Sequence, residues 1–164
     1  MNGPNFLIWC GGTSYSQPVN LSRKLRYFVG NGSGFVMELE AKRIKISIGG
    51  ITVEAELKPT RTAVGIYNAL PIESTLNQWG EEFYCNIPGV KDHRETATTN
   101  VKIGDVAFWG LGGMLAVFFG RTPMSIGEDP VPADRVNVVG HLVDNPEVLR
   151  QVVGATVMKV EKAS

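Results

Sequence analysis

The sequence predicts a mainly β protein, a closed or nearly closed β-barrel capped by two short α-helices. Apolar and polar residues alternate at 43–58 on both sides of a Gly-Gly pair. The most apolar stretch, 101–125, has the pattern of two strands joined by a Gly-rich turn. The chain also lacks the strand–helix alternation of parallel sheets. A closed sheet would hide its edges and both of its apolar faces, and 164 residues suffice for one domain with a sizeable core.

Residues 1–36 differ from the rest of the chain. They are rich in Gly, Asn and Ser, no periodicity persists, and Gly30–Gly34 has the composition of a flexible linker. Met37 then begins a clean amphipathic pattern. We therefore predict a flexible N-terminal extension at 1–36, or an upstream mis-start, and a folded domain at 37–164.

The segment 43–58 gives the most detailed local prediction, a β-hairpin. The two-residue loop Gly49-Gly50 suits the positive φ of a tight hairpin turn and fixes the register of both strands. Opposite charges then face each other on the polar side, which supports this register. The predicted pairs are Ile48–Ile51, Ile46–Val53 and Ile44–Ala55 on the apolar side, and Lys45–Glu54 and Arg43–Glu56 on the other.

A short helix and then a strand should follow the hairpin. Thr60 is a suitable N-cap, and Pro71 ends the helix. Helical spacing places on one stripe Ala63, Ile66, Tyr67 and Leu70. The strand is predicted at 79–87, with Trp79, Glu81, Phe83, Cys85 and Ile87 on one face and Glu82, Tyr84 and Asn86 on the other.

The C-terminal half adds three strands and one helix before a closing strand. Strands at 105–109 and 114–119 are apolar on both faces, so they should be covered on both sides or line a groove. An Asp-Asn-Pro-Glu run at 144–147 is typical of a helix start. The remaining predicted elements are a long loop at 121–134, a strand at 136–143, a helix from Asp144 to about Val153 and the closing strand at 155–160.

The composition limits the classes of partner. The 16 basic and 16 acidic residues give no net charge, which argues against a nucleic-acid-binding surface. The longest apolar run, 110–120, is shorter than the roughly 20 residues that span a bilayer. Two cysteines without a CxxC motif fit a reducing cytosol, and neither histidine has ligand spacing to another. We therefore expect a cytoplasmic protein, a monomer or weak homodimer, with no nucleic-acid or membrane partner, no metal and no other cofactor.

Several motifs give the sequence a resemblance to cyclophilins. They are the helix entry 58–63, the Gly-rich turn and strand 110–116 followed by Gly120–Pro123, and the strand 136–143 with the start of the next helix, 146–149. A small prokaryotic group of cyclophilin-like proteins of unknown function is more similar. Its pattern resembles Trp79-Gly80-Glu81-Glu82, Gly104-Asp105-Val106, the run from Phe118 to Ser125, and Val136-Asn137-Val138-Val139-Gly140. The resemblance covers about 44–160 and implies a cyclophilin-like barrel.

The resemblance also implies a reaction, but the residues for it are not matched. Cyclophilins catalyse rotation about Xaa-Pro bonds, whose barrier is about 18–20 kcal/mol, with an Arg donor in an apolar proline pocket. Here acids at 81–82 stand where that Arg belongs, and Val136 stands about where the family has its His. The sequence therefore disfavours prolyl isomerase activity, and the catalytic residues, if any, are unknown.

The adjacent acids Glu81 and Glu82 point to opposite faces of a strand, so one of them must face an apolar region. That residue either forms an ion pair, with Arg121 or Arg61 as partner, or lines a pocket with a raised pKa. The predicted ligand-binding residues are Glu82, Trp109, Phe118, Arg121 and Thr122.

Two classes of function are compatible with these residues. The favoured one is a domain that binds a peptide or small ligand in a groove without catalysis. The alternative is an enzyme, either a divergent peptidyl-prolyl isomerase or a subunit of an amide-hydrolysing complex. Because a fold alone does not determine a reaction, the geometry of the site must separate the two.

Overall fold

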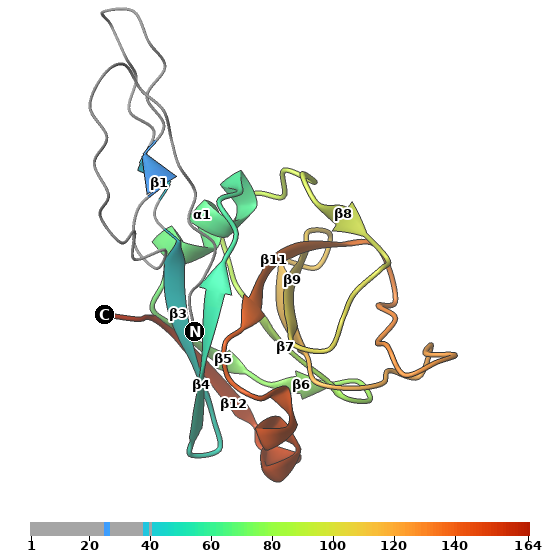
Figure 1. Cartoon of the computed structure of the whole chain (residues 1–164). Helices are drawn as coiled ribbons and strands as arrows, with labels where there is room; N and C mark the ends of the chain where they lie inside the picture. Colours follow the sequence, from blue (N-terminus) through green and yellow to red (C-terminus); the bar gives the residue numbers. More distant parts are fainter. Residues whose placement is uncertain (1–24, 27–37, 40) are drawn as a thin grey trace, which may run out of the picture.

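The computed structural model of the chain describes residues 25–26, 38–39 and 41–164 (Figure 1). Nearly all of the predicted extension 1–36 lies outside the described residues, and its boundary at Met37 stays a prediction. A two-stranded antiparallel pair joins β1 (Leu25–Arg26) to β2 (Glu38–Leu39). Among the described residues, no helix is long and apolar enough to cross a membrane.

The main element of the fold is one antiparallel sheet of ten strands. Its strand order is β5-β12-β3-β4-β11-β9-β10-β7-β6, and β8 pairs with β11 beside this path. The strands are β3 (Lys42–Ile48), β4 (Ile51–Leu57), β5 (Ile72–Thr75), β6 (Asn77–Gln78), β7 (Glu82–Asn86), β8 (Ala97–Thr98), β9 (Asp105–Trp109), β10 (Met114–Phe118), β11 (Val136–Leu142) and β12 (Val157–Lys162). The prediction of a mainly β protein with two short helices is confirmed.

The predicted closed barrel needs a correction, because the sheet curls but its ladder of hydrogen bonds does not close. Its two end strands, β5 and β6, are consecutive in the chain and are separated only by Leu76. Leu76 is buried, and its backbone N–H donates to the carbonyl of Thr156, 2.9 Å away. The chain thus passes through Leu76 from one end strand of the sheet to the other, and these two strands do not pair with each other.

The hairpin of β3 and β4 has the predicted register. Ile48 pairs with Ile51 across the Gly-Gly turn, and the pairing continues to Lys42 and Leu57. Both glycines of the turn have positive φ, 55° and 87°. Arg43 lies 3.5 Å from Glu56 and 3.8 Å from Glu54. Local alternation and turn chemistry are therefore enough to define this part of the fold.

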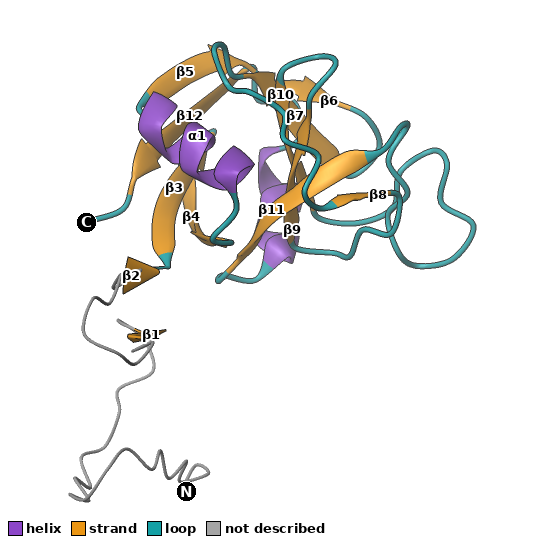
Figure 2. Cartoon of the chain, turned by 90° about the horizontal axis from the view of Figure 1, so that it is seen from above, coloured by secondary structure: helices purple, strands orange, loops and turns teal. Residues whose placement is uncertain are grey.

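Two short helices lie at opposite ends of the curled sheet (Figure 1). Helix α1 (Arg61–Ala69) has the predicted apolar stripe, and Figure 2 looks down on it across one end of the sheet. The second helix, η1 (Pro146–Val152), packs under the β3–β4 turn, where a Cβ on Gly49 would lie 3.0 Å from Val152. This segment is a 3₁₀ helix and not the predicted α-helix. Its residues Pro146, Leu149 and Val152 recur every third position, the repeat that lines up on one side of a 3₁₀ helix.

The N-cap of α1 allows a direct test of this local prediction. The Thr60 hydroxyl accepts a hydrogen bond from the backbone N–H of Ala63 at 3.2 Å. We expect Thr60→Ala to lower the free energy of unfolding by about 1 kcal/mol in urea titrations, because the substitution removes a partner of a helix-end N–H. Thr99→Ala, in an exposed loop, should change it by less than about 0.5 kcal/mol. Equal losses in the two variants would contradict the capping role.

Strands β9 and β10 have buried side chains on both faces, as their apolar composition predicts, and β7 pairs with β10 beside them. One face contributes to the main core, which includes Phe83, Phe108 and Leu115. The opposite face holds a smaller second core, whose buried members are Val101, Ala107, Ala116, Phe118, Val136 and Val138. Tyr84 and Trp109 pack against this second core from its partly exposed side. The candidate site lies at this edge of the second core.

Candidate functional site

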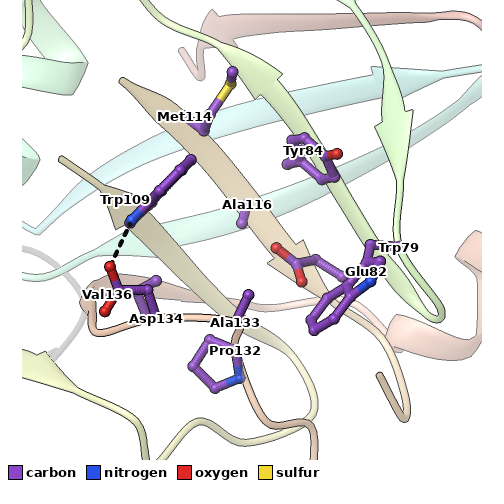
Figure 3. Close-up of a pocket in the computed structure, with 10 residues that line it drawn as sticks. All are labelled: Trp79, Glu82, Tyr84, Trp109, Met114, Ala116, Pro132, Ala133, Asp134 and Val136. Carbon is purple, nitrogen blue, oxygen red and sulfur yellow. Dashed lines mark hydrogen bonds between the residues drawn. The ribbon is translucent and has the colours of Figure 1, made fainter. Parts of the chain in front are cut away.

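A pocket of about 250 Å³ opens on the outer face of β7, β9 and β10, beside the second core (Figure 3). The loop before β11 forms its remaining wall. Among the described residues, the lining is mainly apolar and aromatic, and it contains two carboxylates and no Lys, Arg or His. Its residues are Trp79, Glu82, Tyr84, Trp109, Met114, Ala116, Pro132, Ala133, Asp134 and Val136.

The β6–β7 hairpin places Trp79 and Glu82 side by side. Gln78 pairs with Phe83, and the backbone N–H of Trp79 donates to the Glu82 carbonyl at 3.0 Å. A continuous strand from 79 to 87 was therefore a wrong prediction, because the chain turns at Gly80, whose φ is +62°. Trp79 consequently shares a face with Glu82 and not with Glu81.

Glu81, in the turn of this hairpin, is hydrogen-bonded to the loop that follows β10. Its backbone N–H donates to the Arg121 carbonyl at 2.8 Å, and its carboxylate accepts from the Arg121 N–H at 3.0 Å. The carboxylate also lies 2.5 Å from Arg150, and this ion pair lowers the pKa of Glu81. Of the two adjacent acids, Glu81 thus has the ion pair. Its cation is Arg150, not the expected Arg121 or Arg61.

Two glycines allow the β6–β7 turn and the loop after β10 to approach this closely. A Cβ on Gly120 would overlap the Glu81 carboxylate. A Cβ on Gly80 would meet the Arg121 carbonyl at 2.8 Å and the Thr122 Cα at 2.9 Å. The motifs around 79–82 and 118–125 that resemble cyclophilin-like proteins therefore contact each other. We call this contact, between the turn at Gly80 and the loop at Gly120, the joint. It orients the Trp79 and Glu82 side chains at the pocket.

Substitution of Gly80 should disrupt this joint. We expect Gly80→Ala to lower the free energy of unfolding by about 2 kcal/mol or more, because it combines a positive φ with a clash against backbone atoms that cannot move aside. Gly89→Ala is the matched control, since Gly89 also has a positive φ, 78°, but open space around its Cβ position. Urea denaturation of both variants would measure the difference, and a loss no larger than that of Gly89→Ala would contradict the proposed joint.

Glu82 is the unpaired carboxylate of the pocket. In Figure 3 its carboxylate extends from β7 over Ala116 of β10, toward the middle of the space between the lining residues. Within 41–164, no hydrogen bond or ion pair reaches this carboxylate. Burial therefore raises the pKa of Glu82 to about 7.

Trp109 forms the aromatic wall opposite Glu82. Its indole Nε1–H donates to the Asp134 carboxylate at 3.4 Å (Figure 3). Its six-membered ring lies over Gly112, where any Cβ would overlap it. The Gly-rich turn between β9 and β10 is thus needed for the position of this indole as well as for the hairpin.

The structure brings together two of the five predicted ligand-binding residues. Glu82 and Trp109 line the pocket. Phe118 pairs with Glu82 across the strands but is fully buried in the second core. The Arg121 guanidinium donates to the Ser125 carbonyl at 3.3 Å, and the buried Thr122 hydroxyl donates to the Val131 carbonyl at 2.5 Å. These three residues lie outside the pocket lining, and no observation tests a role for them in ligand binding.

Sequence reasoning left several lining residues out of the predicted set. Tyr84 could have been found, because strand alternation already placed it on the face of Glu82. Trp79 was assigned to the wrong face, since the turn at Gly80 was not recognised. Asp134 and Pro132 come from a long irregular loop, for which side-chain periodicity gives no signal.

Comparisons with known proteins concern the same part of the chain. Residues 42–161 match the family described as Cyclophilin-like. The solution structure of the hypothetical protein AF2241 from Archaeoglobus fulgidus is similar, with 35% sequence identity and a TM-score of 0.64. This similarity covers 75% of the present chain and 95% of the archaeal chain. No curated protein matches the sequence.

Proposed function

Because the chain belongs to the cyclophilin-like family, as its motifs predicted, we propose that it is a binding domain of that fold. Its pocket receives a compact ligand and does not act on it chemically. The observation that carries this proposal is the pocket itself, an aromatic and apolar cavity with one unpaired carboxylate, positioned by the joint at Gly80 and Gly120. A concave apolar site with few polar groups is the usual form of a ligand-binding site.

The size of the pocket restricts the ligand. Pockets for drug-sized ligands occupy about 300–1,000 Å³, and this pocket has about 250 Å³. It therefore suits a small molecule, or a single side chain of a peptide that binds along the surface. Lining residues from β7, β9 and β10 are held by a continuous ladder, so such a ligand would enter a largely preformed site.

The charges of the pocket argue against the prolyl isomerase alternative. That reaction needs a cationic donor at the prolyl nitrogen, and the lining residues that the structure describes include two carboxylates and no cation. Arg121, the one arginine among the predicted ligand-binding residues, directs its guanidinium to the Ser125 carbonyl of its own loop. No feature of the described residues specifically favours a subunit of an amide-hydrolysing complex.

An NMR titration of the full chain tests the proposal. The probes are the peptide Ala-Ala-Pro-Phe and a set of compact alcohols, amides and amines, and the observed signals are the indole N–H resonances of Trp79 and Trp109. We expect compact probes to shift both signals, and Ala116→Val, which narrows the pocket floor, to weaken that binding. Cis–trans exchange of the peptide catalysed by the protein, and lost in Arg121→Ala, would instead establish an isomerase. Unchanged indole signals with every probe would reject the pocket as a binding site.

A further inference from the structure

The pocket combines aromatic walls with an unpaired carboxylate. Its walls include three aromatic side chains, Trp79, Tyr84 and Trp109, and its interior holds the Glu82 carboxylate (Figure 3). A carboxylate in an apolar site is unfavourable unless a cation or hydrogen-bond donors compensate for the loss of water. In the part of the chain that the structure describes, no side chain supplies that compensation to Glu82.

The aromatic walls indicate that the charge that compensates Glu82 is positive. The faces of Trp and Tyr rings carry negative electrostatic potential, so a cation is attracted to them and an anion is not. The other titratable groups of the lining are Asp134, at the rim near Trp109, and Tyr84 on β7. Neither is cationic. The remaining walls, from β10 and the loop before β11, contribute only apolar side chains besides Asp134.

We propose that the ligand of this pocket is a compact organic cation of the ammonium type, with its charged head against Glu82 and its carbon substituents against the aromatic walls. This inference rests on the proposed binding function and specifies its ligand class. An inorganic cation fits less well, because the lining has few oxygen ligands and a large apolar area. An organic cation matches both the carboxylate and the rings.

Binding of a cation should be coupled to the protonation of Glu82. With a pKa of about 7, about half of the free protein carries a neutral Glu82 at pH 7, and only the ionised form pairs with the cation. The affinity should therefore rise about tenfold from pH 6 to pH 8, as the ionised fraction rises from about one tenth to about nine tenths. At pH 7 the complex should release about half a proton for each cation bound.

Pairs of ligands that have the same shape but differ in charge test whether the pocket recognises the charge. Choline and 3,3-dimethyl-1-butanol have the same shape, but only choline is charged, and n-butylammonium and 1-butanol form a second pair with a primary ammonium head. Calorimetry with the full chain, in buffers without amines, should show at least about tenfold tighter binding of one cation than of its neutral partner. Glu82→Gln should abolish this preference and the pH dependence. Glu128→Gln, which removes an exposed carboxylate outside the pocket, should change neither.

The outcomes distinguish the inference from the function on which it rests. If neutral and charged partners bind equally well, and Glu82→Gln leaves both affinities unchanged, the pocket binds ligands but the cation inference is wrong. If no member of either pair shifts the Trp79 and Trp109 indole signals at millimolar concentration, both the proposed function and the inference are rejected. A cation preference that persists in Glu82→Gln would also overturn the inference, because the charge would then be recognised elsewhere.

Discussion

The free energy of unfolding should fall by about 3 kcal/mol or more when Gly140 is changed to Ala. Gly140 lies in β11, between β4 and β9 near the middle of the sheet. A Cβ at this position would overlap the Glu56 carbonyl oxygen and lie 3.2 Å from the Leu57 Cα, both backbone atoms of β4. Because the ladder holds these atoms in place, the added methyl must separate β4 from β11, which costs more than ordinary overpacking of a side chain.

A β-bulge explains why β11 approaches β4 so closely at this point. The pairing of β11 with β9 shifts between Val138 and Gly140, so Val139 is the extra residue. The Val139 carbonyl accepts a hydrogen bond from the backbone N–H of Lys58 at 2.7 Å. The glycine is thus required by the backbone contact next to the bulge and not by its own φ.

Urea denaturation of two alanine variants measures this effect. Gly127→Ala is the control, since Gly127 lies in an exposed loop and no atom of the described residues lies within 4 Å of its Cβ position. That substitution should change stability by less than about 0.5 kcal/mol. Comparable stabilities of Gly140→Ala and Gly127→Ala would show that the close approach of β4 and β11 does not exist in solution.

Short-range patterns in the sequence predicted the longer strands, but not the short strands β5, β6 and β8, and they did not predict how the sheet ends. The register of β3 and β4 follows from alternation and a Gly-Gly turn, both local features of the chain. The end of the sheet depends instead on how β5, β12 and the buried Leu76 meet, with Leu76 bonded to Thr156 from the far end of the chain. No periodicity in the sequence reports such a contact.

The candidate site shows the same division between local and long-range information. Alternation predicted that Glu81 and Glu82 face opposite sides, and that one of them meets an apolar surface. Which of them is paired depends on Arg150, 69 positions after Glu81 in the chain. The position of Trp79 depends on a single positive φ at Gly80. The residue types of the pocket were thus predictable in part, but their arrangement around one cavity was not.

Glu82→Gln should stabilise the ligand-free protein by about 2–3 kcal/mol at pH 8 and leave its stability unchanged near pH 4. Burial raises the pKa of Glu82 to about 7 from an ordinary value of 4.5. Between these two values the folded state binds a proton at Glu82 that the unfolded state has lost, so the contribution of Glu82 to stability falls as pH rises from 4.5 to 7. A tenfold change in proton affinity corresponds to about 1.36 kcal/mol, and the partial access of water to the pocket reduces the total.

The contribution of the neighbouring residue Glu81 to stability should change with pH in the opposite direction, so Glu81 is an internal control. The Arg150 ion pair lowers the pKa of Glu81, so this carboxylate stabilises the fold above its unfolded pKa, and the contribution disappears as pH falls through the lower folded value. Glu81→Gln should therefore be less stable than the wild type at pH 7, whereas Glu82→Gln should be more stable. Urea denaturation from pH 4 to pH 8, in buffers free of organic amines, would measure both. A Glu82→Gln variant that gains nothing between pH 5 and pH 8 would show that water or a cation already compensates the carboxylate, and the pocket would then lack the unpaired charge on which the proposed ligand class depends.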